Sequence, residues 1–139
     1  MIAQLIEFGS RHSELLAAAL VVTGLLAGLE LYRRAIGSKS LSPTQAALFM
    51  NRENPIIIDI RDIASFSKAH LPAARHIPYT QLSAALKKLK MKRPILIIAD
   101  GNDALYKVAR QLHQHGFTQL YHLEGGIRAW QQADLPLAQ

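Results

Sequence analysis

Two aspartates in the middle of the chain have a spacing that permits three kinds of chemistry. Asp100 and Asp103 closely follow the apolar run Pro94–Ile98, in the segment Asp-Gly-Asn-Asp. A carboxylate there can act as a nucleophile, ligate Mg²⁺ or cap the N-terminus of a following helix. No phosphate-binding lysine or Ser/Thr partner accompanies the pair, so a phosphotransfer site is not indicated. The favoured interpretation is that Asp100, Asn102 or Asp103 caps a helix, worth about 1 kcal/mol each.

Thiol and metal chemistry are restricted by the composition. The 139 residues include no cysteine, which excludes a disulfide, a thiolate zinc site, an iron–sulfur cluster and a thiol nucleophile from this chain. His113, His115 and His122 do not have the spacing of a metal triad, because residues two apart on a helix face different directions. We therefore expect neither a cofactor nor a metal ion.

Other polar and aromatic residues have positions that indicate structural roles. Asp59 and Arg61 lie two apart at the end of an apolar run, so both side chains point to one face. We expect them to form an ion pair, because an unpaired buried charge is costly. Gly125–Gly126 permits a tight turn from strand to helix. Trp130 is interpreted as core packing, and His70 as a side chain that hydrogen-bonds a loop.

The elements that must position these residues alternate between strand and helix. Near-continuous apolar runs indicate buried strands, and capping residues mark the helix ends. The expected helices are Pro43–Met50 after Ser42, Ile63–Ala69, a helix from a Thr80 cap to Leu89, Leu105–His115 before Gly116, and Ile127–Ala133. The expected strands are Ile56–Ile60, a brief extended piece His76–Pro78, Pro94–Ile98 and Gln119–Leu123. This alternation predicts an α/β fold with a parallel sheet and helices on both faces.

The N-terminal part contains an uncharged apolar run, Leu15–Leu29, which predicts a transmembrane helix over residues 15–32. A span needs roughly 20 residues, so this one suffices when Glu14, Glu30 and Tyr32 lie at the interfaces. The alternatives fit less well: a signal peptide would begin with basic residues, a buried helix would need a larger domain, and an interfacial helix would have a polar face. We expect a short segment at 1–14, the span at 15–32, a linker at 33–42 and a soluble domain at 43–139.

Basic residues near the ends of the span set its predicted orientation. Arg33, Arg34 and Lys39 follow the span, and Arg11 precedes it. By the positive-inside rule, the C-terminal domain lies in the cytoplasm and the short N-terminus lies outside. The expected location is the inner membrane, crossed once.

Charge and small residues suggest partners. Sixteen basic and ten acidic residues give a formal charge of +6. The basic stretch Lys87–Arg93 suits anionic lipid, or is simply a solvated helix end. No aromatic residue is interleaved with it, so nucleic acid is not an expected partner. Gly24 and Gly28 form a G-x-x-x-G pair that permits a homodimer through the span, although glycine is also common in membrane helices.

Three segments, in order and in register over roughly residues 41–139, resemble the rhodanese family. The segment Ile57–Arg61, with Asp59 and Arg61, resembles the family's "hydrophobic–Asp–x–Arg" strand. The segment Ala69–Pro78, with His70 and Pro72, resembles its "GHIPGAxxIP" segment. The segment Leu123–Pro136, with Gly125, Gly126 and Trp130, resembles its "L-x-GG-x-x-x-W…LP" ending. The resemblance implies a small five-stranded parallel sheet between helices.

The resemblance also implies where an active site would lie. In that family a loop "C-x-x-G-x-[RS]-[ST]" follows the strand that matches Pro94–Ile98. Its backbone N–H groups surround a cysteine sulfur, and the next helix stabilises the thiolate or persulfide. Counting from the two ends of the segment puts the cysteine position at Ala99 or at Ile98. The matching loop consists of Ala99, Asp100, Gly101, Asn102, Asp103 and Ala104.

Neither candidate position offers a nucleophile, and two acids lie where an anion would bind. A carboxylate about 5 Å from a bound anion repels it by about 1–3 kcal/mol at an effective dielectric of about 20–80. We therefore expect a membrane-anchored, catalytically inactive rhodanese-like domain that acts as a protein-binding or regulatory module at the cytoplasmic membrane face. Its expected partner is another membrane or cytoplasmic protein. The alternative is a sulfurtransferase, for thiosulfate or persulfide, that depends on a partner's cysteine.

Overall fold

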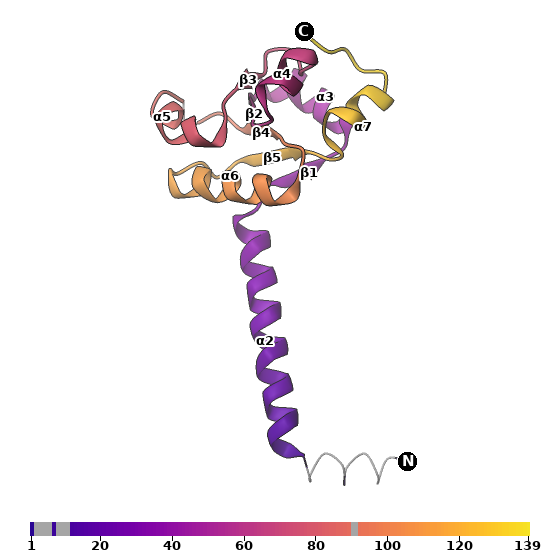
Figure 1. Ribbon diagram of the computed structural model, residues 1–139, viewed down its shortest axis with the longest axis vertical. Coiled ribbons are helices and arrows are strands. Elements are labelled where there is room, and N and C mark those ends of the chain that lie inside the picture. Colours follow the sequence, from indigo (N-terminus) through magenta and orange to yellow (C-terminus); the bar gives the residue numbers. More distant parts are fainter. Residues whose placement is uncertain (2–6, 8–11, 90–91) are drawn as a thin grey trace. The chain divides into compact units, whose positions relative to one another are not determined.

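The computed structural model describes Met1, Glu7 and residues 12–89 and 92–139, with the side chains of residues 33–36 left out (Figure 1). The chain divides into two compact units, Met1–Ala35 and Ile36–Gln139. The first consists mainly of one helix, and the second contains the sheet.

The N-terminal helix, α2, runs over Ser13–Ile36. Its segment Ser13–Tyr32 has 20 residues, and among the described residues it alone is long and apolar enough to cross a membrane. At a rise of about 1.5 Å per residue, this length matches a hydrocarbon core of about 30 Å. Its leucines and valines are exposed, as Leu20 is at 74%.

The second unit follows the alternation that the sequence predicts. Its strands are β1 (Lys39–Leu41), β2 (Ile56–Asp59), β3 (Arg75–His76), β4 (Ile95–Ile98) and β5 (Leu120–Leu123). Its helices are α3 (Pro43–Glu53), α4 (Ile63–Lys68), the 3₁₀ turn η1 (Tyr79–Gln81), α5 (Leu82–Leu86), α6 (Asn102–Gln114) and α7 (Gly126–Gln132).

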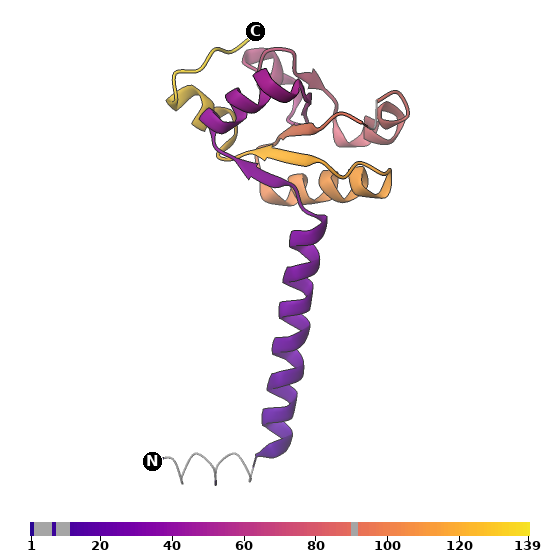
Figure 2. The same cartoon turned by 180° about the vertical axis from the view of Figure 1, so that it is seen from behind.

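The five strands form one sheet in the order β1-β5-β4-β2-β3, and all neighbouring pairs are parallel (Figure 2). Strand β4 lies at the centre, with Ile97 opposite Ile58 of β2 and His122 of β5. All four of its residues are buried. The unbroken apolar sequence follows from this position, because a central parallel strand is covered on both faces. The predicted five-stranded parallel α/β fold is confirmed.

Two apolar clusters lie on the two faces of the sheet. On one face, Ile95 and Ile97 pack with Val108 and Leu112 of α6 and with the leucines of α5. On the other face, the core contains Ala46 of α3 and Ile127 and Trp130 of α7, together with Leu96, Ile98 and Leu123. The sheet therefore fixes the N-terminal ends of α6 and α7 at the edge where β4 and β5 end.

Two local predictions need correction. Residues 33–42 were expected to be a linker, but α2 continues to Ile36 and Lys39–Leu41 forms β1, paired with β5. Thr80 was expected to cap a helix to Leu89, but it lies inside η1, and α5 ends at Leu86. Pro78, with an extended backbone, occupies the N-cap position of η1, so Thr80 already lies within the turn and cannot cap it.

The start of α3 follows the expected capping chemistry. The Ser42 hydroxyl accepts a hydrogen bond from the backbone N–H of Gln45, at 3.3 Å, and the Gln45 side chain accepts one from the Ser42 N–H, at 3.0 Å. This reciprocal pair is a capping box, followed by Pro43 at the first helical position. The helix extends to Glu53, beyond the predicted end at Met50, and terminates where Asn54 adopts a left-handed conformation with φ 45°.

Candidate functional site

The segment after β4 is much shorter than a curled loop would be. Only Ala99, Asp100 and Gly101 connect Ile98 to α6, which begins at Asn102 rather than at the predicted Leu105. Residues Asn102, Asp103 and Ala104, expected in a loop, lie in the first turn of the helix. The segment before α6 is therefore shorter than the loop that the resemblance implies.

The cap of α6 also differs from the expectation. Gly101 occupies the N-cap position with extended backbone, φ −157°, and no side chain caps the helix. Asp100 precedes the cap. Asp103 lies in the first turn, where its negative charge interacts favourably with the positive end of the helix dipole. The prediction that Asp100, Asn102 or Asp103 caps the helix is therefore wrong, because the residue at the cap is a glycine.

The Gly125–Gly126 turn closes the site from the end of β5. Gly125 has φ 72° and Gly126 has φ 61°, a backbone conformation that side chains disfavour. A Cβ atom on Gly126 would lie 3.2 Å from the Ala99 carbonyl oxygen, and one on Gly125 would lie 2.6 Å from Cβ of Ala129. The turn therefore needs glycine for its conformation and for its close approach to the β4–α6 segment.

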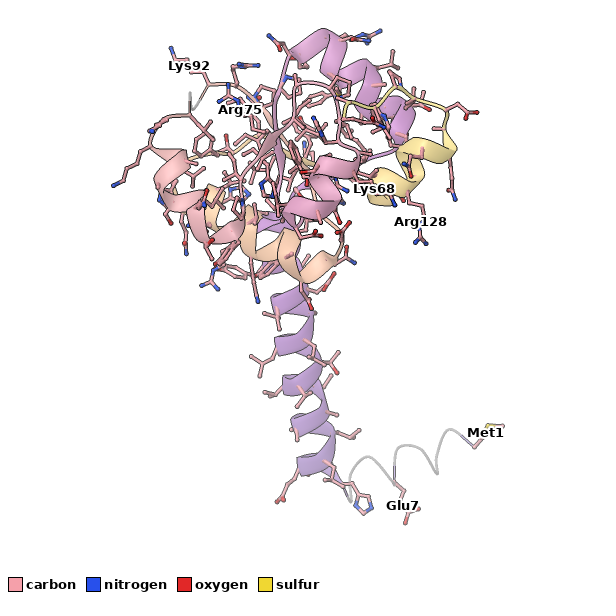
Figure 3. All side chains as sticks on the ribbon, turned by 45° about the horizontal axis from the view of Figure 1, so that its top comes forward. Met1, Glu7, Lys68, Arg75, Lys92 and Arg128 are labelled. Carbon is pink, nitrogen blue, oxygen red and sulfur yellow. The ribbon has the colours of Figure 1, made fainter. Side chains whose placement is uncertain are left out.

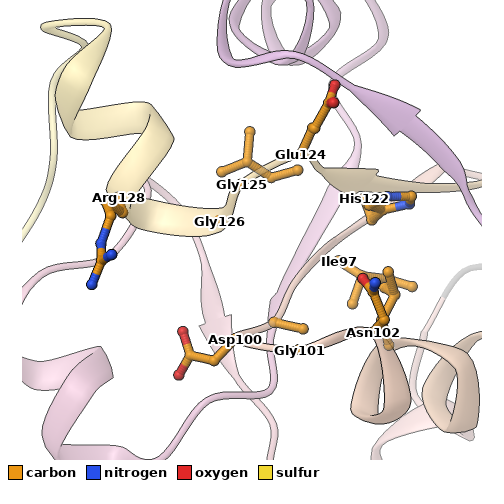
Figure 4. Close-up of a pocket in the computed structure, with 12 residues that line it drawn as sticks. Ile97, Asp100, Gly101, Asn102, His122, Glu124, Gly125, Gly126 and Arg128 are labelled. Carbon is orange, nitrogen blue, oxygen red and sulfur yellow. The ribbon is translucent and has the colours of Figure 1, made fainter.

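A hollow of about 550 Å³ opens between these two turns (Figure 4). Asp100 and Gly101 lie on one edge, opposite the Gly125–Gly126 turn. The polar residues that line the hollow are Asp100, Asn102, His122, Glu124 and Arg128. We call this the loop hollow.

Only one of the two candidate cysteine positions lines the loop hollow. Ala99 lines the hollow and is half-buried. Ile98 is fully buried in the core that faces α7. Of these two positions, Ala99 is therefore the one that can meet a molecule in the loop hollow, and its side chain is a methyl group.

A second hollow of about 520 Å³ adjoins the first and shares Asp100 and Arg128 with it. It also includes Ser65 and Lys68 of α4 and Gln131 of α7. Arg128 points outward from α7 in Figure 3. The two hollows together form a groove with charges of both signs, which we call the loop groove.

Asp59 and Arg61 form a buried pair beneath the loop groove. The Arg61 Nε atom lies 3.0 Å from Asp59 Oδ1, and Nη2 lies 2.7 Å from Oδ2. Nη2 also donates to the Ala69 carbonyl oxygen, at 2.7 Å, and the Arg61 backbone N–H donates to Asp59 Oδ1. The His76 Nε2–H donates to the Arg61 carbonyl oxygen, at 2.7 Å. These bonds neutralise both charges and tie β2 to the segment before β3.

The remaining motif residues have structural surroundings. The His70 ring stacks on Phe66, with ring centres 4.0 Å apart, and its Nδ1–H donates to the Phe66 carbonyl oxygen. The backbone of His70 pairs with Ala138. The Trp130 ring is buried, and its Nε1–H donates to the Pro136 carbonyl oxygen, at 2.9 Å. The C-terminal segment is thereby held against α7 and the end of α4.

His122 is a titratable group of the loop hollow. Burial lowers the pKa of the His122 ring, and a hydrogen bond to Ser38 and the charge of Glu124 oppose the shift without cancelling it. Its Nδ1 lies 2.9 Å from the Ser38 hydroxyl oxygen. His122 is therefore neutral at neutral pH. Among the described residues, no group of three His, Asp or Glu side chains gathers as a metal site.

Sequence reasoning did not select Glu124, Arg128 or Lys68 as site residues. Their positions offered a signal, since Glu124 follows β5 directly, at the edge where parallel strands carry their ligands. Arg128 lies in the first turn of α7 within the predicted Gly-Gly motif. The contribution of Lys68 depends on how α4 packs, which no local pattern encodes.

The comparison with protein families decides the classification. The model of the rhodanese-like domain matches residues 42–133, which is more than half of the chain. The chain belongs to the rhodanese-like domain family. Its charged loop groove and the Asp59–Arg61 pair are thus features of a rhodanese-like domain whose loop position Ala99 carries no thiol.

Curated relatives include sulfurtransferases. The chain is 26% identical over 92 residues to thiosulfate sulfurtransferase GlpE of Pseudomonas putida F1, covering 66% of this chain and 84% of that protein. It is 28% identical over 92 residues to the GlpE of Vibrio cholerae, covering 66% of this chain and 87% of that protein.

Solved structures share the fold. The BH2092 protein of Bacillus halodurans matches with a TM-score of 0.65 and 20% identity, over 81% of this chain and 84% of that one. The rhodanese-like domain of the Alr3790 protein from Anabaena sp. matches with a TM-score of 0.64 and 20% identity, over 73% and 79% of the two chains. These similarities support the five-stranded fold.

Proposed function

We propose that this rhodanese-like domain is a catalytically inactive, membrane-anchored module that binds a protein partner through the loop groove at the cytoplasmic face of the inner membrane. The observation that carries the proposal is the methyl group of Ala99 in the loop hollow. Sulfur transfer requires a thiolate that attacks the donor sulfur and holds it as a persulfide. The chain has no cysteine to form that bond.

The electrostatics of the groove also oppose a small sulfur anion. Asp100 and Glu124 line the loop hollow beside Ala99, and Arg128 is the only lining arginine or lysine among the described residues. A thiosulfate dianion would therefore meet net repulsion at this place. A protein segment with alternating charges would instead find Asp100, Arg128 and Lys68 next to one another along the groove.

The membrane part of the proposal depends on α2. Its segment Ser13–Tyr32 has the length and composition of a span. Two consecutive arginines, Arg33 and Arg34, follow the apolar segment. By the positive-inside rule, the rhodanese-like domain would face the cytoplasm. A partner bound in the loop groove would then be recruited to the membrane.

Site-directed photo-crosslinking in living cells tests the proposal. A photoreactive residue replaces Asn102, which lines the loop hollow, or Glu53, an exposed residue at the end of α3. We expect a specific protein adduct from position 102 and none from position 53. Adding Arg128→Glu should abolish the adduct, because it reverses the charge shared by both hollows.

The same experiment addresses the sulfurtransferase alternative, which the similarity to GlpE favours. A partner that supplies the missing thiol would present a cysteine in the loop hollow. Mapping the adduct peptide at position 102 shows whether a cysteine lies there. An adduct that does not depend on Arg128, or equal adducts from positions 102 and 53, would reject the loop groove as the binding surface.

A further inference from the structure

A third cleft lies between η1 and α5 on one side and α6 on the other. Its volume is about 450 Å³, and α5 and α6 lie side by side in Figure 1. Among the described residues, it shares none with the loop hollow or with the adjoining hollow. Its walls include Tyr79 and Ser83, Lys107, Arg110 and Gln111 of α6, and His115, which follows α6.

The charge of this cleft has one sign. No carboxylate occurs among its lining residues as the structure describes them. Lys107 and Arg110 lie three residues apart on α6, on one face of the helix, and both are exposed. Asp103 lies one turn before Lys107, but no ion pair joins these two in the described part of the chain. Two cations therefore face the cleft without an internal anion to neutralise them.

An unpaired acceptor lies in the same cleft. The Gln111 side chain donates from Nε2 to the Ser83 hydroxyl oxygen, while its Oε1 atom is buried without a hydrogen-bond partner among the described residues. Exchanging the amide oxygen and nitrogen would leave a buried donor unpaired instead, so the mismatch persists in either orientation. A buried polar atom without a partner is costly. Because this oxygen is inaccessible from the cleft as placed, a ligand satisfies it only when the Gln111 side chain turns toward the cleft.

We propose that this cleft binds a phosphate group that carries neighbouring hydroxyls, as in a nucleoside monophosphate or the glycerol headgroup of an anionic lipid. The forked donors of Arg110 match phosphate oxygens, and Lys107 adds a point charge. A ligand hydroxyl pairs with the Gln111 amide once that side chain turns toward the cleft. Tyr79, 50% exposed, offers a ring face at the rim.

Backbone amide NMR on the full-length protein in phosphatidylcholine nanodiscs tests this proposal. AMP and inorganic phosphate are titrated separately. We expect saturable shifts of the Ser83, Arg110 and Gln111 amides, with tighter binding of AMP because it supplies hydroxyls and a stacking ring. Arg110→Gln should weaken AMP binding about tenfold or more, because a charge-assisted hydrogen bond is lost. Lys107→Gln is the second variant, with a smaller expected loss.

A second arm uses nanodiscs that contain phosphatidylglycerol and no added ligand. Saturable shifts of the same amides with rising phosphatidylglycerol content, reduced by Arg110→Gln, would identify the lipid headgroup as the source of the phosphate. Arg52→Gln on α3 makes the same charge change outside the cleft and should leave binding unchanged. The proposal is overturned when neither arm gives saturable shifts, or when Arg52→Gln weakens binding as much as Arg110→Gln does.

Discussion

The Arg61 guanidinium donates hydrogen bonds to the Asp59 carboxylate from two nitrogens, Nε at 3.0 Å from Oδ1 and Nη2 at 2.7 Å from Oδ2. The Asp59 side chain is fully buried, and that of Arg61 is 6% exposed. Each charge therefore depends on the other, because water does not solvate either one. This pair fixes the end of β2 beneath the loop groove.

Removal of one partner should be strongly destabilising. We expect Asp59→Asn to lower the free energy of unfolding by about 3–5 kcal/mol, because Arg61 would remain buried without its counter-charge. Urea unfolding of the full-length protein in detergent, followed by the near-UV signal of Trp130, measures the loss. Asp62→Asn alters an exposed cap residue of α4 and should change stability much less. Equal losses in the two variants would contradict the structural role of the pair.

A cysteine introduced at position 99 should have a thiol with an ordinary pKa. Only three residues join β4 to α6, which begins at Asn102. Asp100 and Glu124 line the same hollow and disfavour a second negative charge. We therefore expect the thiol of Ala99→Cys to have a pKa near about 8.5, measured from the pH dependence of its alkylation by iodoacetamide. A pKa below about 7 would show that an anion-stabilising loop persists.

Acidification should destabilise the domain through His122. Burial lowers the pKa of His122 from 6.5 in the folded state, so the unfolded chain binds the proton more tightly. The contribution of this ring to stability is complete above pH 6.5 and is lost as the pH falls below that value toward the folded-state pKa. His122→Gln should flatten the stability profile in this window. The pKa of Asp62 is lowered from 3.8 by hydrogen bonds from Ser65, so this residue affects stability only at lower pH than His122 does.

The proposed topology makes a labelling prediction. Because the chain has no cysteine, a single introduced cysteine reports its own side of the membrane. Ser67→Cys, at an exposed site on α4, should react with an impermeant maleimide in inside-out vesicles and not in intact spheroplasts. Glu7→Cys, on the other side of α2, should give the reverse pattern. The same pattern for both variants would contradict a single span.

The sequence is informative where one residue's role depends on its near neighbours. Runs such as that of β4 predict buried strands because both faces of a central parallel strand are covered. The Ser42 cap and the Asp59–Arg61 pair are visible for the same reason, since their partners lie two or three residues away. These local features predicted the alternation of strands and helices, and the resemblance to the rhodanese family implied the five-stranded sheet.

Features that depend on distant partners were missed. Strand β1 has three residues, Lys39–Leu41, with little apolar character, and it is a strand because β5 lies beside it. The β4–α6 turn was expected to be longer, because the Asp and Asn residues suggested caps while Gly101 takes that position. The loop groove draws Lys68 from α4 and Arg128 from α7, elements far apart in the sequence. Only the packing of these helices brings the two cations together.

The most direct test of catalytic inactivity is the transfer of sulfur from thiosulfate to cyanide by the purified full-length protein, with a cysteine-bearing rhodanese as the positive control. Ala99 offers no atom that can accept sulfur, so we predict thiocyanate formation no faster than in a heat-denatured sample. Turnover above that background by the native chain, free of contaminating enzyme, would contradict the account.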